Sequence, residues 1–80
     1  MQLNIYTPES VFYSGDADSV TLPGTSGSFQ ILNHHAPIIS SLTKGTLSFS
    51  VNGEIRQIEV VDGLVEMHNN KVTICIDEIL

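Results

Sequence analysis

Apolar and polar residues alternate along most of the chain with a period of two, the spacing of β-strands that bury one face. In the clearest run, Leu47, Phe49 and Val51 alternate with two serines. Similar stretches occur at residues 2–6, 18–22, 64–68 and 72–77, and Val11–Tyr13 starts a further predicted strand. No window of about 12 residues keeps apolar side chains at helical spacing, so we expect strands and no stable helix.

Turn signals separate the alternating stretches. Thr43–Gly45, Asp62–Gly63 and Asn69–Asn70 combine residues that favour chain reversal. From Thr43 onward these signals recur at about the 8- to 12-residue spacing of short strands joined by turns. This pattern predicts an all-β fold, either a β-sandwich or a flattened barrel.

Asn52–Gly53 is a strong signal for a two-residue β-hairpin loop. Such a loop pairs Leu47 with Ile58 and leaves Ile55 on the opposite face from Leu47. Two interpretations stay open at this point. Either the opposite face is also partly covered, or the loop is longer than two residues.

The stretch Val20–Ile39 has an apolar arm at each end and a polar middle. Its middle contains residues that interrupt regular structure. We therefore predict a shaped loop with a short strand embedded around Phe29 and Ile31. Long, structurally specified loops often carry function. The interrupting residues are Pro23, Gly24, Gly27, Asn33 and Pro37.

Composition narrows the class of protein. The 80 residues include 41% hydrophobic and 15% charged residues, which suits one folded domain over residues 1–80. The net charge of −6 disfavours nucleic acid and anionic lipid as partners. A single cysteine excludes an internal disulfide. No signal peptide or run of about 20 apolar residues is present, so we expect a soluble cytosolic domain.

Candidate chemistry is sparse. His34 and His35 are adjacent and point in opposite directions on extended backbone, which favours structural hydrogen bonds over a shared metal. Gly24–Gly27 is not followed by the lysine of a phosphate-binding loop, so a turn is favoured. No nucleophile elbow occurs. Cys75 lies inside a predicted strand, which favours a packed, inert thiol.

Several motifs, taken in order, resemble the N-terminal domain of the epsilon subunit of the F-type ATP synthase, called delta in mitochondria. The resemblance covers essentially the whole chain. The motifs are Val20-Thr-Leu-Pro-Gly-Thr-x-Gly-x-Phe, His35-Ala-Pro-Ile-Ile, Gly45 before a strand, Asp62-Gly-Leu-Val-Glu66 and Lys71-Val-Thr-Ile.

The resemblance implies a ten-stranded β-sandwich, or flattened barrel, in the central stalk. It implies a non-catalytic rotor subunit without cofactor or metal. Such a subunit links the gamma subunit to the membrane c-ring and couples proton flow to ATP synthesis. The implied location is the cytoplasmic face of the bacterial inner membrane, as a peripheral part of the complex without lipid insertion.

Residues in the family's contact regions carry over by position. The expected c-ring contacts are Gly24, Thr25, Ser26, Gly27 and Ser28, with Gln30, Asn33 and His34 as lesser candidates. The expected gamma-subunit contacts are Thr7, His35, Ser40 and Asp62.

The chain departs from the family pattern at a few positions. Asn33 and His34 replace the first proline and the glycine of Pro-Gly-His-Ala-Pro. Ser28 stands where members often carry an acidic residue, and Asp62 replaces a small residue. Most bacterial members continue into a two-helix C-terminal domain, which binds ATP in some species and can inhibit rotation. Because the sequence ends at Leu80, we expect a short form that lacks helical inhibition.

A second class of function stays open. A small β-sandwich could instead be a ligand- or protein-binding module unrelated to ATP synthase. Such a module would need a concave apolar pocket with convergent polar groups. With 3 Phe, 2 Tyr and no Trp, the sequence offers few aromatics for that pocket.

Overall fold

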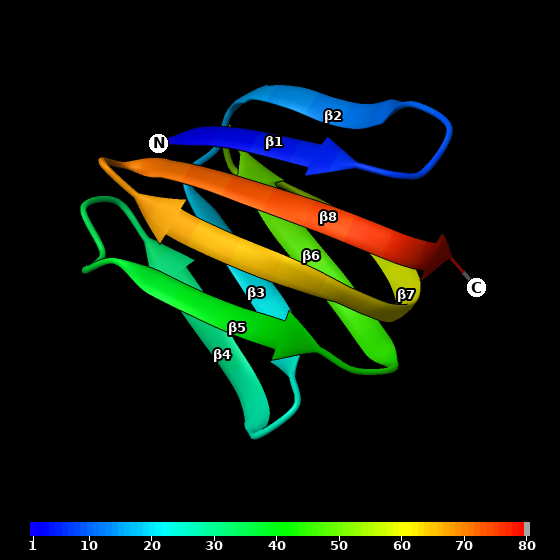
Figure 1. Ribbon diagram of the computed structural model, residues 1–80. Helices are drawn as coiled ribbons and strands as arrows, with labels where there is room; N and C mark the ends of the chain where they lie inside the picture. Colours follow the sequence, from blue (N-terminus) through cyan, green and yellow to red (C-terminus); the bar gives the residue numbers. More distant parts are fainter. Residues whose placement is uncertain (80) are drawn as a thin grey trace.

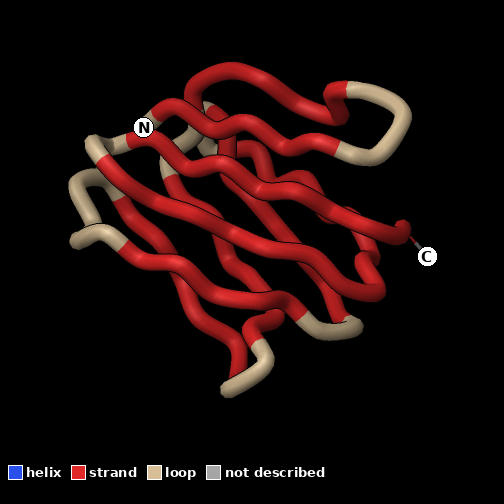
Figure 2. Tube along the Cα trace, in the orientation of Figure 1, coloured by secondary structure: helices blue, strands red, loops and turns tan. Residues whose placement is uncertain are grey.

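The computed structural model describes the backbone of residues 1–79 and the side chains of residues 1–77. Strands dominate the described chain, and loops lie mainly at its ends (Figure 2). The all-β prediction is confirmed, but the described residues form eight strands rather than ten. The strands are β1 (Gln2–Tyr6), β2 (Val11–Asp16), β3 (Ser19–Gly24), β4 (Gly27–Leu32), β5 (Ile38–Leu42), β6 (Gly45–Val51), β7 (Glu54–His68) and β8 (Lys71–Ile79).

The strands form two layers (Figure 1). The front layer contains β2, β1, β8, the second part of β7 and β5, in that order. The rear layer contains the first part of β7, followed by β6, β3 and β4. Strands β1 and β8 pair in parallel, whereas the other described pairings are antiparallel. The long strand β7 therefore belongs to both layers.

The turn that we predicted at Asp62–Gly63 is wrong, because β7 continues through these residues. The pairing of β7 with β8 shifts register between Val60 and Gly63 instead. A Cβ atom on Gly63 would lie 2.6 Å from the carbonyl oxygen of Cys75, so β8 approaches too closely for a side chain here. Asp62–Gly63 marks an irregularity where one strand passes between layers, and the chain does not reverse.

The predicted hairpin at Asn52–Gly53 is confirmed. Val51 pairs with Glu54, so the loop has two residues, and Leu47 pairs with Ile58. Both loop residues have positive φ, 51° and 80°, as a type I′ turn requires. Neither open interpretation holds, because the loop is short and Ile55 is 63% exposed.

Most of the predicted loop at Val20–Ile39 is a second hairpin, formed by β3 and β4. Pro23 lies inside β3 and Gly24 is its last residue, so the proline does not interrupt the strand as we expected. The carbonyl oxygen of Pro23 accepts a hydrogen bond from the N–H of Thr43 at 2.8 Å, so the proline still takes part in the hydrogen bonding around the sheet. The predicted embedded strand exists as β4, and residues 33–37 remain irregular.

The core lies between the two layers and consists almost entirely of aliphatic side chains. Ile74 and Ile76 point into it and are essentially unexposed. Cys75 lies between them on the same strand and is exposed, so the prediction of a packed thiol is wrong. Fully buried side chains include Leu3, Ile5, Val20, Leu22, Ile31, Leu47, Val60, Val65, Met67 and Val72.

Candidate interaction surfaces

The outer face of the front layer carries a row of exposed apolar side chains. The cross-strand partners run from Val11 to Tyr6, from Tyr6 to Cys75 and from Cys75 to Leu64. Ile39 on β5 lies diagonally next to Leu64. Their exposed fractions include 39% at Tyr6, 48% at Leu64 and 69% at Ile39. We call these five residues the outer band.

The outer face of the rear layer is polar. Thr21 lies between Gln30 and Ser48 across the strands β4, β3 and β6. A parallel row runs from Leu32 through two serines to Ile55, so these two exposed apolar side chains are not neighbours. Hydroxyl and amide groups therefore dominate this face. Its polar members include Ser19, Thr21, Gln30, Ser48, Ser50 and Gln57.

Residues 24–28 comprise the two-residue turn between β3 and β4 and the strand ends beside it, and we call them the tip. The N–H of Thr25 donates to the carbonyl oxygen of Ser41 at 3.2 Å, and the two hydroxyl groups are also 3.2 Å apart. These bonds tie the tip to the end of β5. A Cβ atom on Gly24 would lie 2.8 Å from the carbonyl oxygen of Gly27, so the turn is closely packed.

The structure separates the expected c-ring contacts into two groups. Gly24, Thr25, Ser26, Gly27 and Ser28 are adjacent in the tip. Gln30 follows on β4, and Asn33 and His34 lie beyond the other end of that strand. In Figure 1 the tip and the β4–β5 loop are at opposite ends of β4. One flat surface cannot contact both groups unless it spans the whole strand.

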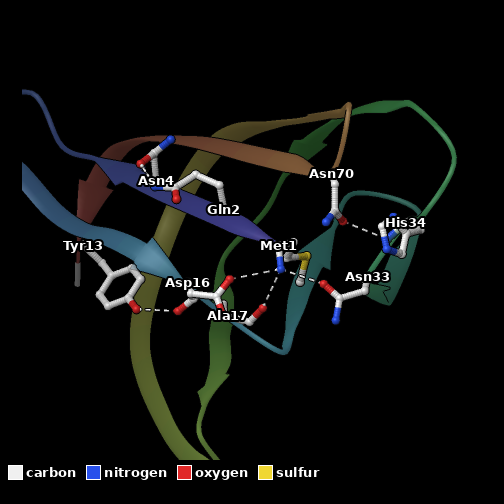
Figure 3. A network of polar contacts seen from close by, with 9 residues as sticks. All are labelled: Met1, Gln2, Asn4, Tyr13, Asp16, Ala17, Asn33, His34 and Asn70. Carbon is white, nitrogen blue, oxygen red and sulfur yellow. Dashed lines mark hydrogen bonds and ion pairs between the residues drawn. The ribbon is translucent and has the colours of Figure 1, made fainter.

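Asn33 belongs to a polar network at the start of the chain (Figure 3). The amino group of Met1 donates to Oδ1 of Asn33 at 2.6 Å, to the carbonyl oxygen of Ala17 at 3.1 Å and to Oδ1 of Asp16 at 3.2 Å. The side chain of Met1 is buried. Each N–H of the amino group therefore has an acceptor. These hydrogen bonds join three segments of the chain.

His34 and His35 form part of a turn after β4. The N–H of His35 donates to the carbonyl oxygen of Leu32 at 3.2 Å and closes the turn. His34 has a φ of 63°, and its N–H donates to Oδ1 of Asn70 at 2.8 Å. Nδ1 of His35 lies 2.7 Å from the carbonyl oxygen of Ala36. These contacts fit the structural role expected for loop histidines.

Two of the four expected gamma contacts border the outer band. Thr7 follows Tyr6, and its N–H donates to the carbonyl oxygen of Ser10 at 2.9 Å in the β1–β2 turn. Asp62 is exposed two residues before Leu64. Ser40 follows Ile39 but pairs with the buried Val65, so its side chain lies on the other side of β5 from the outer band. His35 lies in the loop before β5 begins, four residues ahead of Ile39.

Our sequence analysis missed the outer band. A usable signal is present where two apolar residues stand side by side in a strand, as at Ile38–Ile39 and Leu64–Val65. In such a pair one side chain must face outward. Among the side chains of residues 1–77, no group of three potential metal ligands is close enough to hold a metal ion. That part of the chain also contains no helix of a length and hydropathy that could cross a bilayer.

The fold and its surfaces define a small β-sandwich domain with a band of exposed apolar side chains on one outer face and a hydrogen-bonded turn between β3 and β4. Comparison with known proteins identifies the family. The model of the ATP synthase delta/epsilon chain β-sandwich domain matches residues 1–80. The chain belongs to this family, as its motifs predicted.

Bacterial relatives carry the name ATP synthase epsilon chain. The relative from Desulfitobacterium hafniense is 41% identical over 75 residues, which cover 94% of this chain and 57% of the relative. The relative from Leptospira borgpetersenii is 34% identical over 77 residues, covering 96% of this chain and 61% of the relative. The chain thus spans about three fifths of the length of these relatives.

Solved structures show the same fold at low sequence identity. A chain in the central stalk and c-ring structure of the Tetrahymena thermophila mitochondrial ATP synthase matches with a TM-score of 0.87 at 19% identity. The match covers 99% of this chain and 64% of that one. A chain of the Euglena gracilis mitochondrial ATP synthase matches with a TM-score of 0.90 at 17% identity, covering 98% and 51%.

Proposed function

We propose that this protein is a central-stalk subunit of an F-type ATP synthase that links the gamma subunit to the c-ring. In this role it couples proton flow to ATP synthesis without catalysing a reaction itself. The main support for this proposal is the family match over residues 1–80, together with relatives that are named as ATP synthase subunits. A subunit of this kind works at the cytoplasmic face of the membrane and needs no cofactor.

The outer band is the proposed contact surface for the gamma subunit. Its five exposed side chains are neighbours on one sheet face, and contiguous exposed apolar surface is typical of protein interaction sites. Burying one Leu or Ile side chain stabilises a complex by about 1.5–3 kcal/mol. Thr7 and Asp62 would form part of the polar rim of this interface. Ser40 would contact gamma only from the other side of β5, and His35 would contact it from the loop just before β5.

The tip is the proposed contact with the c-ring. Thr25, Ser26, Gly27 and Ser28 are exposed, and backbone hydrogen bonds hold the turn against β5 and the residue after it. A turn that is already ordered loses little conformational entropy on binding. Because Ser28 has no charge, its contact would use hydroxyl and backbone groups. Gln30, Asn33 and His34 would contact the ring only if it extended along β4.

A matched pair of variants tests the gamma contact. Leu64→Glu places a charge inside the outer band, and Ile55→Glu places the same charge on the rear face. Titration calorimetry with the purified gamma subunit should give a Kd that rises about 10- to 100-fold for Leu64→Glu, the effect of losing a hot-spot contact. The Kd of Ile55→Glu for the gamma subunit should stay within about twofold of the wild-type value. An equal loss of gamma affinity in both variants would show that the outer band is not part of the interface.

A cross-linking experiment tests the c-ring contact. Ser26→Cys and Gln57→Cys each place a thiol on an exposed strand or turn, the first in the tip and the second on the rear face. Both are made in a Cys75→Ser background so that only the new thiol reacts. In the assembled synthase, a short thiol-to-amine or photoactivated cross-linker should join Ser26→Cys to the ring. A product from Gln57→Cys alone would contradict the assignment of the tip.

A further inference from the structure

Asn70 joins three segments of the chain at one end of the sandwich (Figure 3). It lies in the turn between β7 and β8, and its carbonyl oxygen accepts a hydrogen bond from the N–H of Gln2 at 3.1 Å. Its side-chain Oδ1 accepts the N–H of His34 at 2.8 Å. His34 is 36 residues away in sequence, in the loop that passes from the rear layer to the front layer. Asn70 is therefore a junction between both layers and the start of β1.

The loop at residues 33–37 has few other means of keeping its shape. All five residues are exposed, so apolar packing does not hold them. His34 has a φ of 63°, a left-handed conformation that is unfavourable for any residue with a Cβ atom. Such a conformation persists only where surrounding contacts impose it. The described contact on the His34 backbone is the bond from its N–H to Asn70.

We propose that Asn70 is a positioning residue for this loop. Its side-chain oxygen holds His34 in the left-handed conformation and so sets the direction in which His35 leaves the turn. In the family pattern, Pro-Gly stands at positions 33 and 34, where proline fixes φ and glycine accepts positive φ without strain. In this chain, the hydrogen bond between the His34 N–H and Oδ1 of Asn70 fixes the turn in place of those two residues.

A second contact supports the same interpretation. Asn33, the other residue that departs from the family pattern, accepts the amino group of Met1 through Oδ1 at 2.6 Å. Both replaced positions are thus anchored by polar contacts to other segments of the chain, Asn33 through its side chain and His34 through its backbone. The functional part of the inference rests on the proposed function, because His35 is one of the expected gamma contacts.

The neighbouring residue offers a matched control. Asn69 and Asn70 both have positive φ, 52° and 57°, so glycine fits either position without backbone strain. Asn70→Gly removes the side-chain acceptor for His34, whereas Asn69→Gly removes a side chain without this contact. Both variants are made in the full chain. Amide hydrogen exchange is measured by NMR, and gamma affinity is measured by calorimetry.

In Asn70→Gly, the His34 amide should exchange about five- to tenfold faster, the factor expected for one lost hydrogen bond. The Kd for the gamma subunit should rise about two- to fivefold as His35 loses its fixed position. Asn69→Gly should change neither quantity. Equal exchange of the His34 amide in the two variants would overturn the positioning role.

A compensating variant sharpens the test. In an Asn33→Pro/His34→Gly background the turn no longer needs its distant anchor, so adding Asn70→Gly should leave gamma affinity unchanged. A further loss of affinity there would contradict the inference. If wild type fails to bind gamma at all, the proposed function falls, while the exchange comparison still decides whether Asn70 positions the loop. If wild type binds and Asn70→Gly binds equally well, the positioning role for His35 falls alone.

Discussion

The two outer faces of this sandwich enclose the same core but differ in chemistry. The front face carries the outer band, whereas the rear face carries rows of hydroxyl and amide groups. Strand β7 contributes to both. Leu64 on its second part neighbours Cys75, and Ile55 on its first part neighbours Ser50. An isolated exposed apolar side chain is ordinary, whereas adjacent ones mark a contact surface. Neighbours across strands, more than exposure, distinguish the two faces.

The largest expected effect is a difference in stability between variants on the inner and outer sides of strand β8. Ile74→Ala should lower the free energy of unfolding by about 2–5 kcal/mol because it leaves a cavity in the core. Cys75→Ala should change it by less than about 0.5 kcal/mol because that side chain is exposed. Urea denaturation followed by circular dichroism measures both. Similar losses for the two variants would mean that the outer band is buried in the free protein.

The next largest effect concerns the irregularity at Asp62–Gly63, where β7 passes from one layer to the other. Gly63→Ala should destabilise the fold by about 2–3 kcal/mol, because its Cβ atom would overlap the backbone of β8. Gly15→Ala is the control, since the three atoms nearest to the Cβ atom there all belong to the Tyr13 side chain, at 3.0 Å or more, and none to the backbone. Thermal unfolding measures the difference. An unchanged Tm for Gly63→Ala would disprove the close approach of β7 and β8.

A smaller effect is expected where the chain passes from the rear layer to the front layer. His34→Gly should raise the free energy of unfolding by about 0.5–1 kcal/mol, because glycine relieves the left-handed strain but adds entropy to the unfolded chain. His35→Gly should give no gain, since no positive φ occurs at His35. Chemical denaturation of both variants tests this. Destabilisation by His34→Gly would show that its side chain contributes more than its backbone strain costs.

The smallest effect is expected on the rear face. Thr21→Val replaces a half-buried hydroxyl group by a methyl group and should change stability by less than about 0.5 kcal/mol. It should also leave gamma affinity within about twofold of wild type. The pair of measurements checks whether this face is free in the complex. A tenfold loss of affinity would assign the rear face to the interface and weaken the contrast between the two faces.

Local alternation predicted much of this fold. The hairpin at Asn52–Gly53 and its register follow from turn chemistry and a period of two, and both are confirmed. Prediction from the sequence failed where the backbone geometry depends on residues that are distant in the chain. Asp62–Gly63 has the composition of a turn, but pairing with β8 keeps β7 extended there. Pro23 and Gly24 look like strand breakers, and yet they belong to β3 and pair with Ser28 and Gly27 of β4.

The candidate surfaces were less accessible from the sequence. The tip could be placed because five consecutive residues form it. The outer band could not, because its members come from five separate strands and only their pairing makes them neighbours. Cys75 illustrates the difficulty, since a thiol in an apolar strand looks buried until its side of the strand is known. The bond from His34 to Asn70 has no signal in either local sequence.

The parallel pairing of β1 and β8 has a mechanical consequence. The two strands run side by side from Gln2 and Lys71 to Tyr6 and Cys75. A force that pulls the start of β1 away from the end of β8 therefore acts along the strands in opposite directions. The hydrogen bonds between them are loaded together in shear and cannot open one at a time. Under traction along this axis, the domain should yield abruptly at high force rather than unravel gradually from one end.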